Sequence, residues 1–141
     1  MIVTTSSKDL IKHLISINDM GLYLSEKTLE RARDSMHQEY LKRHITAIRD
    51  FNKDLYWHMN AQSEEKEDQF YQSADQFGDM DANYLKILYK NVSMRSLKVY
   101  FKNQITSYNN IIVNYANQLD RSLVEVLNKQ KYKINDFINC C

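Results

Sequence analysis

The sequence predicts an all-α protein, an elongated bundle of four to six helices of which two are long. Three observations support this fold class: the 141 residues include only two Gly and no Pro, 43% are hydrophobic, and apolar residues recur at intervals of three and four. Tight β-turns tend to require Gly or Pro, so a β-sandwich or barrel is disfavoured. The length corresponds to about one domain, and we therefore expect residues 1–141 to form a single helical domain.

The first predicted helix follows Ser6 or Ser7, either of which can act as its N-cap. Four apolar residues then recur with helical spacing: Leu10, Ile11, Leu14 and Ile15. We expect this helix to be short and to end over Asn18 to Gly21, because glycine readily adopts the left-handed conformation found at helix C-termini.

The second predicted helix begins after Ser25, with Glu26 in its first turn, and extends for about 35 residues. Its apolar positions are Leu29, Ala32, Met36, Tyr40, Ile45, Ile48, Leu55 and Met59. A helix of this length would measure about 50 Å at 1.5 Å per residue. The molecule is therefore expected to be elongated, unless the helix breaks near residues 51–53.

A third helix is predicted over residues 63–77, because its clustered carboxylates suit the positive end of a helix dipole. Asp81 then caps a final segment without Gly or Pro. In that segment Leu85, Leu88 and Val92 share one helical face. The opposite face carries Leu97, Phe101, Ile105, Tyr108, Ile112, Tyr115, Leu119 and Val126. Either the helix breaks between Asn91 and Ser96 or its first part is buried on both sides, and residues 129–137 continue it or form a short separate helix.

Charge is distributed unevenly along the chain. Residues 1–81 contain ten Lys and Arg against fifteen Asp and Glu, whereas residues 82–141 contain nine against three. Acidic and basic helices that pack together account for this pattern, and a basic surface for an acidic partner is the alternative. The overall charge of +1 provides no general attraction to nucleic acid. Nucleic-acid binding is an alternative function. The basic residues that would contact the nucleic acid are Lys86, Lys90, Arg95, Lys98 and Lys102.

No catalytic motif is present, so we expect a protein that is not an enzyme and that needs no cofactor. Glycine-rich phosphate loops, nucleophile motifs and cysteine pairs with zinc spacing are all missing. A metal-holding bundle is a further alternative, with His37 and His44 seven residues apart on one helical face and Glu30 and Glu39 near them. The Glu-x-x-His pattern of di-iron bundles is absent, which disfavours this alternative.

Aromatic residues are unusually frequent, with ten Tyr, five Phe and one Trp. Residues 55–57 span about 200° of a helix surface, so they cannot all face one core. Tyr and Trp are common anchors of protein interfaces. The sequence therefore predicts a non-catalytic protein–protein interaction module, such as an adaptor, an inhibitor or a chaperone-like regulator, with a homodimer as one form of the interaction. The predicted partner-binding residues are Phe51, Tyr56, Trp57, Tyr100 and Phe101.

A cytoplasmic location is expected, because no secretory signal and no membrane-spanning apolar segment is visible. The two cysteines are Cys140 and Cys141 and cannot close a disulfide loop around the fold. A Cys-Cys end behind several lysines is similar to the doubly lipidated ends of small trafficking GTPases. Membrane attachment is expected only if these two cysteines are lipidated.

Overall fold

The computed structural model describes residues 6–61 and 93–139. These residues form four α-helices and no strand, which confirms the predicted all-α bundle. The helices are α1 (Ser7–Arg31), α2 (Ser35–Ala61), α5 (Met94–Tyr115) and α6 (Arg121–Asn139), with a short 3-10 helix, η1 (Ala116–Gln118), before α6. The two long helices have 25 and 27 residues, so the bundle is about 40 Å long and elongated.

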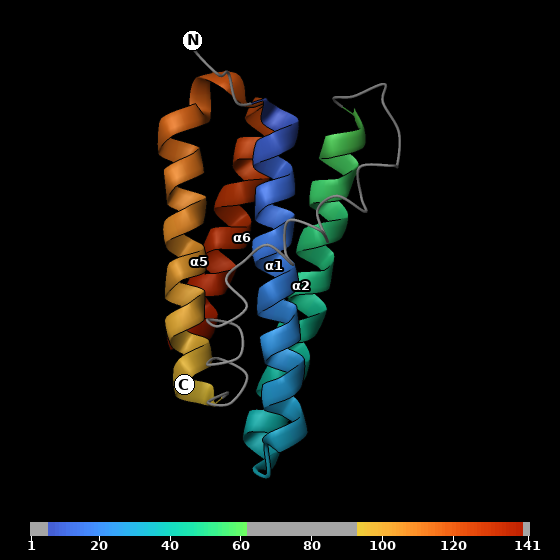
Figure 1. Ribbon diagram of the computed structural model, residues 1–141, viewed down its shortest axis with the longest axis vertical. Coiled ribbons are helices and arrows are strands. Elements are labelled where there is room, and N and C mark those ends of the chain that lie inside the picture. The colour runs from blue at the N-terminus through green and yellow to red at the C-terminus, as the bar shows by residue number, and fades with distance from the viewer. Residues whose placement is uncertain (1–5, 62–92, 140–141) are drawn as a thin grey trace.

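The helices are arranged as two antiparallel hairpins, α1 with α2 and α5 with α6 (Figure 1). α1 packs on α2 and on α5, while α6 packs on α5 and on α2, and the contact between α2 and α6 is the sparsest of these four. α2 and α5 run in the same direction, so the end of α2 and the start of α5 lie at opposite ends of the bundle. Among the described helices, α2 and α6 are the neighbouring pair that packs least closely.

The first helix is longer than predicted. The Ser6 side chain caps it by accepting a hydrogen bond from the Asp9 amide at 3.2 Å, as expected. The predicted end at Gly21 is wrong, because α1 continues to Arg31. A Cβ atom at residue 21 would lie 3.3 Å from the ring of Tyr100. Glycine at this position therefore permits the close approach of α1 and α5 and does not end the helix.

The predicted start of the second helix at Ser25 is also wrong. Ser25 is buried within α1, and its hydroxyl donates a 2.7 Å hydrogen bond to the Gly21 carbonyl oxygen. The chain reverses at residues 32–34, and the Asp34 carboxylate begins α2 by accepting a hydrogen bond from the Met36 amide at 2.9 Å. No Gly or Pro marks this turn. α2 then continues through residues 51–53 to Ala61 without the alternative break.

The second hairpin begins within the interval where a change of face was predicted. Ser93 caps α5, and its side chain and that of Ser96 each accept a hydrogen bond from the other's amide, which forms a capping box. The chain reverses at η1, a turn that the apolar pattern of this segment does not reveal. Residues 129–137 therefore lie in α6, a helix separate from α5. The helix predicted over residues 63–77 and the cap at Asp81 lie outside the described residues.

Aliphatic side chains from all four helices fill the core, and Phe101 and Tyr108 are its largest fully buried residues. No helix in the described ranges has the length and apolar character needed to cross a membrane.

Candidate functional site

The structure divides the predicted partner-binding aromatics between the core and the surface. Trp57 is 66% exposed, and Tyr56 beside it is half-buried. Phe51, Tyr100 and Phe101 are 5%, 6% and 1% exposed. These three residues therefore stabilise the bundle, and their proposed role as partner contacts is corrected. The reason is that facing helices of the bundle cover these side chains.

A buried polar network crosses the core and joins all four helices. The Tyr108 hydroxyl on α5 donates to Gln130 Oε1 on α6 at 2.6 Å and accepts from Asn18 Nδ2 on α1 at 2.9 Å. Gln104 Nε2 donates to Asn18 Oδ1. Gln130 Nε2 donates to the Phe51 carbonyl oxygen on α2 at 3.2 Å. Buried hydrogen-bonded networks of this kind determine a unique register between helices.

This network is structural and offers no obvious chemistry. Tyr108 is fully buried, and burial raises the pKa of its phenol, so the hydroxyl stays protonated. Asn18, Gln104 and Gln130 are also buried, at 2% exposure or less. No substrate could reach these groups without opening the bundle.

His44 lies in an aromatic cage between α2, α5 and α6. Its ring is stacked on Phe101 with centroids 4.2 Å apart, lies 3.5 Å from the Phe137 centroid, and meets Tyr40 edge-on at 5.0 Å. Neither ring nitrogen has a hydrogen-bond partner among the described residues. Burial lowers the pKa of His44 to about 3, because a charged imidazole would lose its hydration. The ring is therefore a neutral core side chain at physiological pH.

The row of metal ligands considered in the sequence does not form. Glu30 belongs to α1 and is separated from His37 by the turn at residues 32–34. His37 is exposed and lies 3.9 Å from the Asp34 carboxylate, whereas His44 faces the core and Glu39 is exposed. Within the described ranges no three His, Cys, Asp or Glu side chains are close enough to hold a metal ion.

A groove runs between α2 and α6, which are the least closely packed neighbours among the described helices. Its volume is about 480 Å³. Tyr40, Ala47 and Phe137 provide apolar surface, and the Tyr40 hydroxyl donates to the Phe137 carbonyl oxygen. The polar lining consists of Lys42, Arg43, Thr46, Asp50, Lys133 and Asp136. The groove thus combines an apolar floor with charges of both signs at its edges.

Trp57 extends the α2 wall of this groove. Arg43, Asp50 and Trp57 are spaced seven residues apart, and residues at this interval lie on nearly the same face of a helix. The groove ends near Asp50, and Trp57 lies about two turns further along α2. One face of α2 therefore presents the groove wall and the exposed indole together.

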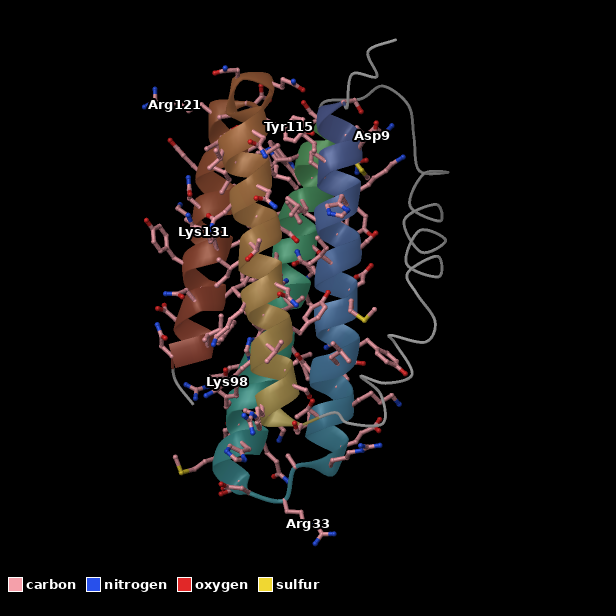
Figure 2. All side chains as sticks on the ribbon, turned by 60° about the vertical axis from the view of Figure 1, so that its left-hand side comes forward. Asp9, Arg33, Lys98, Tyr115, Arg121 and Lys131 are labelled. Carbon is pink, nitrogen blue, oxygen red and sulfur yellow. The ribbon has the colours of Figure 1, made fainter. Side chains whose placement is uncertain are left out.

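A second hollow of about 460 Å³ lies at the end of the bundle where α2 and α5 begin. Arg43, Arg95 and Lys98 line it together with Asp34 and His37. Figure 2 shows Lys98 near this end, above the turn that carries Arg33. The hollow shares Tyr40 and Arg43 with the groove between α2 and α6.

The hollow gathers only part of the basic set considered for nucleic acid. Lys102 is exposed one turn beyond Lys98 and does not line the hollow. Lys86 and Lys90 lie outside the described residues. The contribution of Arg43 could not be read from the sequence, because it comes from another helix.

Comparison of the chain with protein-family models, with curated proteins and with solved structures finds no match.

Proposed function

We propose that this protein is a non-catalytic interaction module that binds an amphipathic helix of another protein in the groove between α2 and α6. The observation that carries the proposal is the groove itself, with its apolar floor and charged edges between two helices that pack loosely. Helix-in-groove recognition uses this arrangement, because apolar anchors of the bound helix fill the floor and its polar residues meet the edges.

The apolar floor of the groove is formed by Tyr40, Ala47 and Phe137, and the methyl group of Ala47 is the smallest of these side chains. The neighbouring Lys42, Arg43 and Lys133 are cationic, while Asp50 and Asp136 are anionic. A partner helix with both acidic and basic residues beside its apolar stripe fits such edges. Complementary charges would determine its direction and register.

Trp57 provides a second contact for the same partner. Its indole is 66% exposed on the α2 face that continues the groove. Trp residues are enriched among the side chains that contribute most to binding at protein interfaces. From Tyr40 to Trp57 the α2 face is about 26 Å long, which matches a partner helix of about 17 residues. The Trp57 indole meets the ring of the buried His58 edge-on, with centroids 4.9 Å apart.

Site-specific photo-crosslinking in the source cells tests this proposal. A crosslinking amino acid would replace Thr46 in the groove or Thr106 on the exposed side of α5. These threonines are a matched pair, because both are exposed and each donates its hydroxyl to the carbonyl oxygen four residues earlier, at 3.1 Å. We expect one discrete adduct from position 46 and none of that mass from position 106.

The mass of the adduct identifies the occupant, which is a second copy of this chain if the adduct weighs twice the protomer. With the identified partner, Thr46→Arg and Trp57→Ala should each weaken binding at least about tenfold, or about 1.4 kcal/mol. Thr106→Arg should leave the affinity within about twofold. Identical adducts from both positions, a double-mass adduct, or equal effects of the two arginine substitutions would refute the proposal.

A further inference from the structure

The hollow at the start of α2 and α5 has the chemistry of an anion site. From its lining we infer that it binds a small organic phosphate, a phosphate monoester whose alcohol part is apolar. This inference concerns a different ligand and a different cavity from the groove, although the two share Tyr40 and Arg43. Its volume of about 460 Å³ falls within the range of small-molecule sites.

Positive charge in the hollow exceeds negative charge. Arg43 from α2 and Arg95 and Lys98 from α5 face a single carboxylate, that of Asp34. Asp34 already caps α2 through the Met36 amide and lies 3.9 Å from the His37 ring. None of the three cations forms an ion pair with another described residue. Among the described residues this positive charge is not compensated, and an anion bound in the hollow would compensate it.

A phosphate monoester matches this charge better than a carboxylate. It has a charge of about −1.5 to −2 at neutral pH, and it offers three oxygens as acceptors. The guanidinium groups of Arg43 and Arg95 can each bind two such oxygens, and Lys98 adds a third cation. A carboxylate has one charge and two oxygens, so it could not engage all three side chains equally.

Backbone amides support the same assignment. Met94 and Arg95 are the first two residues of α5, and amides at these positions have no partner within their own helix. Ser93 uses its side chain to cap the Ser96 amide, one turn further on. The first-turn amides and the positive end of the α5 dipole thus lie next to Arg95 and the hollow.

The remaining wall is apolar and adaptable. Met36 and Met94 line the hollow together with the ring of Tyr40. Met36 is 76% exposed, so its thioether can move onto a ligand without disturbing the core. Inorganic phosphate would leave this wall unused, whereas an aromatic or aliphatic ester would cover it. The wall thus indicates an ester and not the free ion.

The inference is tested by titrating the full chain with phenyl phosphate and monitoring the amide chemical shifts by NMR. We expect saturation with a Kd of about 1 mM and the largest shifts near Met94 and Arg95. Inorganic phosphate should bind at least about threefold more weakly, and phenol should not saturate. No other protein takes part in this assay, so its result is independent of the proposed groove partner.

Substitution on α5 provides the control. The double variant Arg95→Gln and Lys98→Gln should weaken phenyl phosphate binding at least about tenfold, because two charge-assisted contacts are lost. Lys102→Gln removes one positive charge from the same helix outside the hollow, and it should change the affinity less than about twofold. Each variant must retain the wild-type circular dichroism spectrum.

Three outcomes would overturn the inference. If phenyl phosphate does not saturate up to about 10 mM, the hollow is not a binding site for it. A loss of affinity in Lys102→Gln as large as in the double variant would show general attraction to the basic helix. Equal affinities for phenyl phosphate and inorganic phosphate would exclude the ester.

Discussion

Acid should destabilise this protein through His44, and the effect can be calculated from its burial. The ordinary pKa of a histidine is 6.5, and burial lowers that of His44 to about 3. Below pH 6.5 the unfolded chain therefore binds a proton that the folded protein does not bind. Stability from this group is complete above pH 6.5 and is lost as the pH falls toward 3. Linkage gives a loss of about 2 kcal/mol at pH 5 relative to pH 8.

The His44→Phe variant isolates this contribution. A phenyl ring can keep the contacts with Phe101 and Phe137, and it removes the two nitrogens that have no partner among the described residues. His13, whose pKa is lowered by burial, and Asp19, whose pKa is raised by it, are present in both proteins. Their contributions therefore cancel in the difference between variant and wild type.

Urea unfolding monitored by circular dichroism at about pH 8 and about pH 5 measures the difference. The wild type should lose about 2 kcal/mol more than His44→Phe over this interval. If the larger ring strains the cage, His44→Leu provides the same comparison. Parallel losses in wild type and both His44 variants, within about 0.5 kcal/mol, would refute the reasoning.

Three further predictions concern the core. Tyr108→Phe should reduce the free energy of unfolding by about 2 to 3 kcal/mol, because buried partners in the network lose their hydroxyl, and urea unfolding should show this. A loss below about 0.5 kcal/mol would contradict it. Gly21→Val should cost about 2 kcal/mol in the same assay, since the added atoms meet the Tyr100 ring, and an unchanged or increased stability would be inconsistent with this packing. Asn52→Ala should raise the pKa of Asp19, because it removes the 2.8 Å hydrogen bond that favours the carboxylate, and an NMR titration that shows no increase would disprove this.

The residues of the candidate sites could be predicted only in part from the sequence. The exposure of Trp57 agrees with the expectation that one residue of the 55–57 cluster faces outward. Tyr100 and Phe101 were expected at a surface, because a helix pattern identifies an apolar face without showing what covers it. The basic hollow could not be predicted, because Arg43 and Arg95 are far apart in the sequence and meet only through the arrangement of α2 and α5.

By itself the sequence determined the helical class, the elongated shape and the cap of the first helix. The reason is that these features depend on short-range effects: spacing of apolar residues, absence of Pro, and the hydrogen bond of Ser6 to a nearby amide. Such effects act over a few residues and can be read locally.

Only the tertiary structure decided where the helices turn and which faces are covered. Gly21 has the signature of a helix end, yet close packing against Tyr100 explains its presence within α1. Neither the turn at residues 32–34 nor the reversal at η1 contains Gly or Pro. Packing of the hairpins stabilises these turns although their local sequences have only a weak preference for a turn. Burial against a neighbouring helix is a long-range effect, and it determined which aromatics became core and which charges met at one end of the bundle.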